Sequence, residues 1–408
     1  MSSYRLSRCR NCNLESLRLI LDLGNQPLAN SLRETSDNFQ EQRYPLRLVH
    51  CGKCGLLQID VTVDPKLMFT DYNWVTSTSL SSIQHCNNFV RESIQRGSHK
   101  PLSILEIGSN DGTLLKEYAK AGVKKLVGIE PASNLTWGYG EEMDVENLFF
   151  NSINAYKLLS RYGEFEFIVA RNVFSHVPDF LDVARGISAL MNLKSIFFIE
   201  FHWAYEILQG LHYDSIYHEH TYYHSISGIT DVLATVGLNV YDVFKSPISG
   251  GSVVLLATKD HKEPSGELTE LRNLEEQVKI RDFSTWEQFG STALKNIDEL
   301  RDFIVGSETR RICAFGASAR SSTILNSIGE RAHHILSIGD NNPRKWGKYA
   351  PGLQIPIESV EKMISRDPEV IVVFPFNFKT EILDQLVKLN WSGMVFFPIP
   401  HPPKLFSI

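Results

Sequence analysis

Residues 217–224 concentrate side chains that can exchange protons. They read Tyr-His-Glu-His-Thr-Tyr-Tyr-His, so three histidines, three tyrosines and one glutamate fall within eight residues. A histidine can take up a proton near neutral pH, and phenols or imidazoles can stabilise negative charge that develops on an oxygen atom. The segment therefore predicts proton-transfer chemistry.

The conformation of this segment leaves alternatives open. If the segment is extended, Tyr217, Glu219 and Thr221 face one way, whereas His218 and His220 face the other. The two histidines would then also form a possible metal site. A polar structural element without chemistry is the remaining alternative.

Four of the six cysteines form two Cys-x2-Cys pairs, Cys9 with Cys12 and Cys51 with Cys54. Four thiolates suit a tetrahedral zinc ion, and Gly55 fits a turn whose backbone N–H groups point at sulfur. The 38 residues between the pairs predict that each pair lies on its own hairpin. Since four protein ligands leave no open position, we expect a structural zinc site. Chance pairs of free thiols are the alternative.

A glycine-containing turn at residues 105–115 follows a strand pattern and opens a helix pattern. Its spacing is Glu-x-Gly-x-x-x-Gly, and the glycines permit a tight turn and close approach of the backbone to a ligand. An acidic residue before the glycines would repel a pyrophosphate, but it suits the sulfonium and ammonium groups of S-adenosylmethionine (SAM). The turn residues that we expect at this cofactor are Glu106, Gly108, Ser109, Asn110 and Gly112.

Glu130 ends the next strand pattern, 24 residues after Glu106. An acid at this place can accept hydrogen bonds from both hydroxyl groups of a ribose. Together, the turn and Glu130 predict a SAM site. A dinucleotide-binding fold and a turn without a ligand are the alternatives.

Short apolar strands alternate with amphipathic helices between residues 67 and 250. The predicted strands are 103–107, 125–129, 165–170 and 195–201. The predicted helices include 113–121 and 178–191. This alternation predicts an α/β fold with a doubly wound sheet, which binds ligands at the carboxyl ends of its strands. Asn172 and His176 follow the third strand, so we expect them at this edge.

Composition divides the 408 residues into three predicted domains. Residues 1–66 hold the paired cysteines and form a zinc-binding cap, and residues 67–252 form the SAM-binding domain. Residues 253–408 begin with a polar helical connector and continue as a second α/β run, with strands predicted at 312–315, 334–339 and 370–375. This run predicts a carboxyl-terminal Rossmann-like domain.

The overall charge limits the possible partners. A formal net charge of −6 argues against a general nucleic-acid binder.

No apolar stretch approaches the ~20 residues that cross a bilayer, and the first residues lack the apolar region of a signal peptide. We therefore expect a cytoplasmic protein with reduced thiols and no membrane partner.

Taken together, the motifs resemble a known family. The Glu-x-Gly-x-x-x-Gly turn with Glu130 resembles the class I SAM-dependent methyltransferases. With both cysteine pairs and the Tyr-His-Glu-His sequence at 217–220, almost the whole chain resembles the SAM-dependent sugar C-methyltransferases of deoxysugar biosynthesis. The resemblance implies methylation at C-3 of a nucleotide-linked 4-keto-6-deoxyhexose, with SAM and structural zinc as cofactors.

The resemblance also implies roles for individual residues. It makes His220 the general base, and Asn172 a residue near both substrate and cofactor. A tyrosine-rich segment of the family looks like residues 71–77 of this chain. The other residues that the resemblance places at the catalytic site are Tyr217, Glu219, His176 and Tyr72.

Carbon becomes a nucleophile here because the 4-keto group acidifies C-3, and a base such as His220 can then remove the proton. The enolate carbon would attack the methyl group, and no metal is required.

An O- or N-methyltransferase that acts on a sugar or related small metabolite is the main alternative. A zinc-containing binding module with a vestigial SAM fold and an RNA methyltransferase are two others. The proton-transfer residues at 217–224 argue against a vestigial fold, and the acidic net charge argues against an RNA methyltransferase.

In the carboxyl-terminal third, the turn at 315–321 can present backbone N–H groups to an anion. The family resembled has a lysine where this chain has Arg320, so a positive charge is kept. With the turns at 340–347 and 374–377, this turn could line a cleft for the nucleotide diphosphate. A purely structural domain is the alternative.

Overall fold

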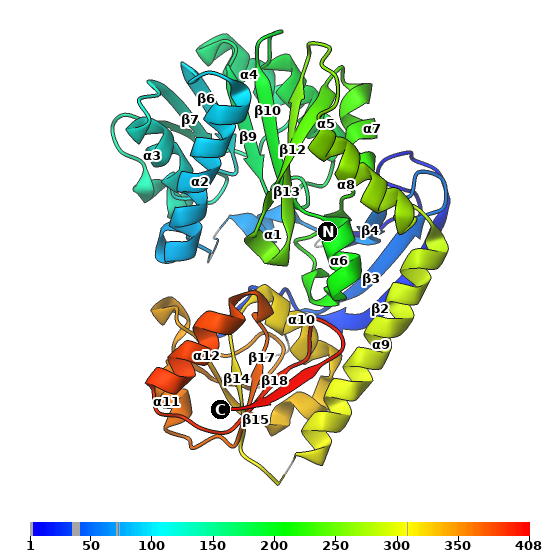
Figure 1. The fold of residues 1–408 in the computed structure, drawn as a ribbon, viewed down its shortest axis with the longest axis vertical. Coiled ribbons are helices and arrows are strands. Elements are labelled where there is room, and N and C mark those ends of the chain that lie inside the picture. The colour runs from blue at the N-terminus through cyan, green and yellow to red at the C-terminus, as the bar shows by residue number, and fades with distance from the viewer. Residues whose placement is uncertain (1–2, 35–40, 71, 73, 308) are drawn as a thin grey trace.

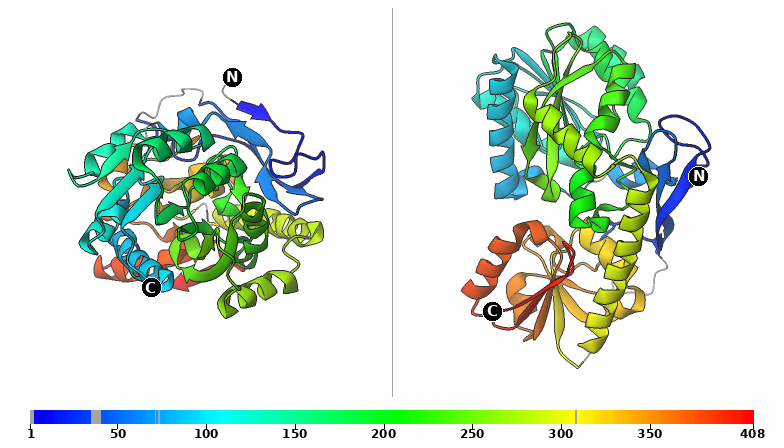
Figure 2. Two further views of the ribbon diagram at one scale, coloured as in Figure 1. Left: turned by 90° about the horizontal axis from the view of Figure 1, so that it is seen from above. Right: turned by 45° about the vertical axis from the view of Figure 1, so that its right-hand side comes forward.

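The computed structural model describes residues 3–34, 41–70, 72, 74–307 and 309–408. Figure 1 shows two lobes, each built around a sheet, with the long helix α9 (Phe283–Gly306) running between them. The amino-terminal strands lie beside α9, at the level where the lobes meet, and Figure 2 shows the same arrangement from two further sides.

The upper lobe contains a seven-stranded sheet. Its strands follow one another in the order β12 (Asn239–Ser246), β13 (Ser252–Thr258), β10 (Ile196–His202), β9 (Phe167–Arg171), β6 (Ser103–Ile107), β7 (Lys125–Ile129) and β8 (Asp144–Glu146). The five strands from β10 to β8 are parallel, and β13 is antiparallel to both of its neighbours. The strands predicted at 103–107 and 125–129 are confirmed to the residue, and the other two are confirmed with ends shifted by one or two residues.

Helices cover both faces of this sheet, so its inner strands are mostly apolar. One face carries α2 (Leu80–Gly97) and α3 (Thr113–Lys120). The other face carries α4 (Ser152–Tyr162), α5 (Phe180–Ala189), α7 (Ile226–Thr235) and α8 (Gly266–Gln277). The doubly wound sheet that the sequence predicted is therefore present.

The cap forms two small antiparallel sheets. The larger has the order β11 (Tyr222–Tyr223), β4 (Leu57–Ile59), β3 (Tyr44–Cys51) and β2 (Leu17–Gln26). The smaller pairs β1 (Ser3–Arg5) with β5 (Val61–Val63), which α1 (Pro65–Phe69) follows. Because β11 belongs to residues 217–224, the cap is hydrogen-bonded to the proton-transfer segment.

The lower lobe contains a six-stranded sheet that is parallel except for its last strand. Its order is β16 (Ile357–Glu358), β15 (Ile335–Gly339), β14 (Ile312–Phe315), β17 (Val370–Val373), β18 (Met394–Phe397) and β19 (Lys404–Ser407). Its helices are α10 (Ala319–Ser327), α11 (Val360–Ile364) and α12 (Lys379–Lys388). This is the predicted second α/β unit.

The predicted boundary after residue 252 falls too early. β13 begins at Ser252 and lies inside the seven-stranded sheet, between β10 and β12. The change in composition that suggested a boundary comes later, at the helical connector formed by α8 and α9. The upper lobe therefore extends through β13, because β12 and β13 form an antiparallel hairpin that cannot be divided between two sheets.

Helix α9 joins the cap to the lower lobe through a shared hydrophobic core. Trp286, Phe289 and Ala293 lie in one buried cluster with Leu21 of β2 and with apolar residues of the lower sheet. At Gly290 the helix approaches β2 so closely that a Cβ atom would lie 2.1 Å from the carbonyl oxygen of Ile20. The cap is thus packed as part of the whole molecule and is not an appended module.

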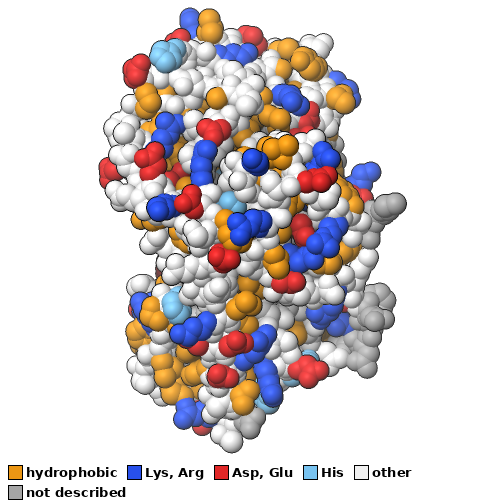
Figure 3. All heavy atoms as spheres, turned by 90° about the vertical axis from the view of Figure 1, so that its right-hand side faces the viewer, with side chains coloured by type: hydrophobic (Ala, Val, Ile, Leu, Met, Phe, Trp, Pro, Cys, Tyr) orange, Lys and Arg blue, Asp and Glu red, His pale blue; other side chains and the backbone are white. Residues whose placement is uncertain are grey.

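On the face drawn in Figure 3, the described Lys and Arg side chains lie among Asp and Glu side chains. This arrangement is not the basic stripe that an RNA-binding face would need. Across the described ranges, no helix combines the length and the apolar character needed to span a membrane.

Candidate active site and zinc centre

A cavity of about 540 Å³ opens at the carboxyl ends of β6, β7, β9 and β10. Four of the expected cofactor residues border it, namely Gly108, Asn110, Glu130 and Asn172. Two of the expected catalytic residues, Tyr72 and His176, border it as well. The parallel sheet thus brings together residues from Gly108 to His176, up to 68 positions apart in the sequence, as strand ends at one edge must do.

The turn after β6 has the tight backbone conformation that its glycines predicted, and close approach to a ligand stays a prediction. Gly108 adopts a φ of +69°, and a Cβ atom there would lie 2.6 Å from Cγ2 of Val173. Gly112 likewise has a positive φ, of +73°, immediately before α3. Ser109 is buried and its hydroxyl oxygen accepts a hydrogen bond from the Tyr139 hydroxyl, so its side chain faces the protein.

Glu130 and Asn110 connect the strand ends to residues 74–76, which lie beside the cavity. One carboxylate oxygen of Glu130 accepts from the backbone N–H of Asn110 at 2.7 Å, and the other accepts from that of Ala132 at 2.8 Å. Asn110 Oδ1 accepts from the backbone N–H of Thr76 at 2.9 Å, while its Nδ2 donates to the carbonyl of Trp74 at 3.0 Å. The turn therefore holds residues 74–76 beside the cavity. Burial raises the pKa of Glu130.

The position of Glu106 differs from the prediction. Its side chain is buried and lies 3.4 Å from the guanidinium of Arg171, and it does not border the cavity. Burial raises the pKa of Glu106 to about 8, although Arg171 favours the charged form. The cation that Glu106 faces is thus part of the protein. Glu106 is the fourth residue of β6, and its side chain points to a covered face of the sheet. Its contact with the cofactor stays a prediction.

The segment at 217–220 is a turn, so the alternation of faces that an extended segment would have does not occur. The Tyr217 hydroxyl lies 2.6 Å from Nε2 of His220, and the two rings pack with centroids 4.0 Å apart. A turn brings residues i and i+3 together, whereas a strand would have pointed them in opposite directions. His218 instead points to the cap, where its Nε2 lies 3.3 Å from the carbonyl oxygen of Pro45.

His218 and His220 therefore do not form the metal pair that was an alternative. Among the residues that the structure describes, the four paired cysteines are the only group with the geometry of a metal site.

His220 is held in the tautomer that a general base needs. Its Nδ1 lies 2.9 Å from the carbonyl oxygen of Ser215, and because a carbonyl only accepts, Nδ1 must carry the proton. Nε2 is then the unprotonated nitrogen, which accepts from the Tyr217 hydroxyl. Burial lowers the pKa of His220 well below its ordinary value, and the neighbouring His176 and Arg320 lower it further. The imidazole is therefore neutral near pH 7.

Glu219 connects three parts of the chain. Its carboxylate accepts a hydrogen bond from Asn30 Nδ2 at 2.6 Å and one from the Tyr72 hydroxyl at 3.5 Å. Burial raises the pKa of Glu219 to about 7, although these two bonds favour the charged form. Asn30 comes from the cap, and the sequence analysis missed it because no motif relates it to a residue 189 positions away.

Tyr72 is held over the cavity by a reciprocal pair of bonds. Its backbone N–H donates to Asn134 Oδ1 at 3.1 Å, and Asn134 Nδ2 donates to its carbonyl at 3.0 Å. Asp71 and Asn73, which belong to the same predicted segment, lie outside the described residues.

His176 and Asn172 lie between the cavity and the turn at 217–220, which is called the catalytic turn below. The His176 ring packs edge-on against that of His220, with centroids 4.8 Å apart. Burial lowers the pKa of His176 to about 4, and within the described chain its Nδ1 has no hydrogen-bond partner. Asn172 directly follows β9 with a φ of +56°, a conformation that asparagine tolerates better than most residues. His220 and Glu219 do not border the cavity themselves, and they contact its wall through His176 and Tyr72.

Two groups of the turn after β14 that could face an anion are bound within the protein. The backbone N–H of Ala317 donates to Asp340 Oδ2 at 2.8 Å, and Lys345 Nζ lies 3.1 Å from the same oxygen. Arg320 forms an ion pair with Asp214. These contacts occupy the Ala317 N–H and the Arg320 guanidinium, and none of these residues borders the cavity. A diphosphate contact of this turn stays a prediction.

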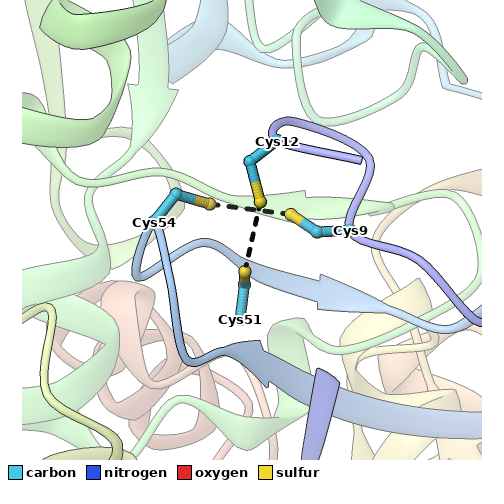
Figure 4. Close-up of side chains that lie close together, drawn as sticks. All are labelled: Cys9, Cys12, Cys51 and Cys54. Atoms are coloured by element: carbon cyan, nitrogen blue, oxygen red, sulfur yellow. Dashed lines mark hydrogen bonds between the residues drawn. The ribbon is translucent and has the colours of Figure 1, made fainter. Parts of the chain in front are cut away.

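The four paired cysteines converge on one point, as Figure 4 shows. Their sulfur atoms lie within 4.8 Å of one another, with 3.6 Å between Cys9 and Cys54 and between Cys12 and Cys51. A tetrahedral zinc ion with Zn–S bonds of ~2.3 Å requires sulfur atoms ~3.8 Å apart, so the four thiols fit this metal. With all four positions filled by sulfur, the metal would have a structural role.

Only one cysteine pair lies on a hairpin of its own. Cys51 and Cys54 occupy the turn between β3 and β4, as predicted. Cys9 and Cys12 instead lie in the connection from β1 to β2, two strands that belong to different sheets. A metal ion held by all four thiols would therefore link this connection to the turn between β3 and β4.

Three family models match consecutive parts of the chain. Residues 9–69 match a zinc binding domain, residues 83–243 match a methyltransferase domain, and residues 247–400 match a C-methyltransferase C-terminal domain. A relative of nearly equal length, the C-methyltransferase NovU of Streptomyces niveus, is 29% identical over 407 residues, which cover 97% of this chain and 96% of that protein.

Solved structures resemble parts of the chain. A magnesium protoporphyrin IX methyltransferase of Synechocystis PCC 6803 with bound SAM has 16% identity and a TM-score of 0.32, over 44% of this chain and 79% of that one. The plantazolicin methyltransferase BpumL in complex with SAH has 13% identity and a TM-score of 0.36, over 44% of this chain and 85% of that one.

The three domain matches occur in one order along a single chain, and the relative of the same length is itself a C-methyltransferase. The seven-stranded sheet and the four clustered cysteines agree with this assignment. The protein is therefore a SAM-dependent methyltransferase that is similar over nearly its whole length to a C-methyltransferase.

Proposed function

We propose that the protein methylates C-3 of a nucleotide-linked 4-keto-6-deoxyhexose, with His220 as the general base. The observation that carries this proposal is the pair of hydrogen bonds on His220. Ser215 fixes the proton on Nδ1, which leaves a basic Nε2 on a neutral, half-buried imidazole. Such a base is needed to form an enolate, because C-3 has no nucleophilic lone pair until its proton is removed.

In the proposed reaction, Nε2 of His220 takes the C-3 proton and the electron pair of the broken C–H bond moves toward the 4-keto oxygen. For this step Tyr217 turns its hydroxyl away from Nε2, which frees the lone pair that takes the proton, and donates a hydrogen bond to the developing enolate oxygen instead. Bound SAM supplies the electrophilic methyl group. Glu219 holds Tyr72 in place, and both help to exclude water from the substrate side of the cavity.

Proton exchange without the methyl donor tests this proposal directly. When the enzyme is incubated in D2O with a nucleotide-linked 4-keto-6-deoxyhexose and no SAM, we expect deuterium to replace the proton at C-3, as NMR would show. The same sugar nucleotide with its keto group reduced is the matched control and should not exchange. A methylated product without exchange would instead support the O- or N-methyltransferase, and the absence of both would contradict methylation of such sugars.

Glu130 tests the cofactor part of the proposal. If its carboxylate accepts hydrogen bonds from the ribose of SAM, Glu130→Ala should weaken SAM binding by about 10- to 100-fold, since bonds to a charged group contribute ~1.5–3 kcal/mol. Isothermal titration calorimetry measures the change. Glu142→Ala is a matched control, because Glu142 is exposed and should leave the affinity unchanged. Equal affinities for both variants would contradict a ribose contact.

A further inference from the structure

The lower lobe reaches the catalytic turn through Arg320, in the first turn of α10. Its Nε and Nη2 donate to the two carboxylate oxygens of Asp214 at 2.6 and 2.7 Å, and its Nη1 donates to the carbonyl of Ser249 at 2.8 Å. The guanidinium also lies over the ring of Phe376, 4.9 Å from its centre. The side chain of Arg320 is 19% exposed and that of Asp214 is fully buried, so this two-bond ion pair is largely shielded from solvent.

Asp214 lies in the short 3₁₀ helix η3 (Tyr213–Ser215), just before the catalytic turn. Helix α10 holds the same segment at a second point, where Thr323 Oγ1 donates to the carbonyl of Ile216 at 3.0 Å. Ser215 lies between these two points, and its carbonyl is the one that accepts from Nδ1 of His220. The lower lobe thus fixes, on both sides, the carbonyl that sets the tautomer of His220.

We infer that Arg320 is a positioning residue for methyl transfer: its ion pair with Asp214 holds the Ser215 carbonyl where it keeps the proton of His220 on Nδ1. This inference rests on the proposed function, because it takes His220 as the base. It assigns the lower lobe a role in the chemical step, although none of its residues borders the cavity.

A diphosphate-binding role for Arg320 fits the contacts less well. Three of the five N–H donors of the guanidinium already bind Asp214 and Ser249. A phosphate that took over the guanidinium would leave the fully buried carboxylate of Asp214 without its partner, and an unpaired buried charge is strongly unfavourable. The ion pair therefore favours positioning over substrate binding.

Steady-state kinetics separate the two roles. For Arg320→Ala and for Asp214→Asn we expect kcat to fall by about 10- to 100-fold with KM nearly unchanged, because misplacement by ~1 Å can lower a rate 100-fold. The double variant should be no slower than either single variant, since both substitutions remove one interaction. Arg320→Lys keeps the charge but offers only a point donor, so it should restore part of kcat. Arg320→Lys also tests the inference if Arg320→Ala does not fold. A rise in KM with kcat unchanged would overturn the inference.

A second measurement needs no substrate and so distinguishes failure of the inference from failure of the proposed function. In protein with ¹⁵N-labelled histidine, the signals of His220, assigned by their loss in His220→Asn, should show the Nδ1–H form in the wild type. In Arg320→Ala and Asp214→Asn they should show a mixture of tautomers. SAM affinity serves as the folding control and should stay at the wild-type value. If the tautomer is unchanged in both variants, the inference is wrong. If it changes as expected while the wild type fails to exchange C-3 protons, only the proposed substrate is wrong.

Discussion

Replacing His220 with asparagine is expected to lower C-3 proton exchange and methyl transfer together, by about 100- to 10,000-fold, which is the usual contribution of a general base. Asparagine is similar in size and can still donate to the Ser215 carbonyl through its amide, but it has no basic nitrogen in place of Nε2. The loss should appear in kcat, because the substituted side chain does not border the cofactor cavity. SAM affinity, measured by calorimetry, should stay at the wild-type value.

His218→Asn is the matched control for this experiment. His218 is a buried histidine of the same turn, but its Nε2 faces the carbonyl of Pro45 in the cap. Its replacement should therefore leave proton exchange close to the wild-type rate, even if it lowers the melting temperature. Exchange at the wild-type rate in His220→Asn would show that another group removes the proton, and Tyr217 would then be the next residue to test.

The parts of the site that the sequence predicted well depend on local patterns. The turn after β6 could be recognised because its two glycines have positive φ values that few other residues adopt, so its conformation is visible in the residue types. Glu130, Asn172 and His176 could be placed because parallel strands end at one edge of a sheet, whatever their order. The strand patterns were sufficient for this, since buried strands are apolar on both faces.

The parts that could not be predicted depend on contacts across long stretches of chain. Asn30 binds Glu219, and Arg320 binds Asp214, over separations of 189 and 106 residues. No spacing rule connects such pairs. The conformation of residues 217–220 was also ambiguous, because a short polar segment shows no periodicity that distinguishes a turn from a strand. Here the turn is imposed from outside, by the pairing of β11 with the cap and by the contacts with α10.

Because the turn at 217–220 depends on the cap, the removal of zinc is expected to have the second large effect. Cys54→Ser should abolish zinc binding, and with it the ordered structure of the cap, because structural zinc contributes ~10–16 kcal/mol in small zinc domains whereas a whole domain is stable by only ~5–15 kcal/mol. The cap carries Asn30 and pairs with β11, so kcat should fall as the cap loses order. Metal analysis, thermal unfolding and the exchange assay measure the three effects.

Cys313→Ser distinguishes loss of the metal from loss of a thiol. Cys313 is buried in the lower lobe, where its Sγ lies 3.6 Å from the hydroxyl of Ser337, so serine should cost little stability and leave the zinc content unchanged. SAM affinity should also survive in Cys54→Ser, since the cofactor residues Gly108 and Glu130 belong to the upper sheet. A zinc-free protein that keeps both its melting temperature and its exchange activity would contradict a structural metal. A zinc-free protein that binds SAM but no longer exchanges the C-3 proton would instead show that the zinc acts by positioning Asn30 and the catalytic turn.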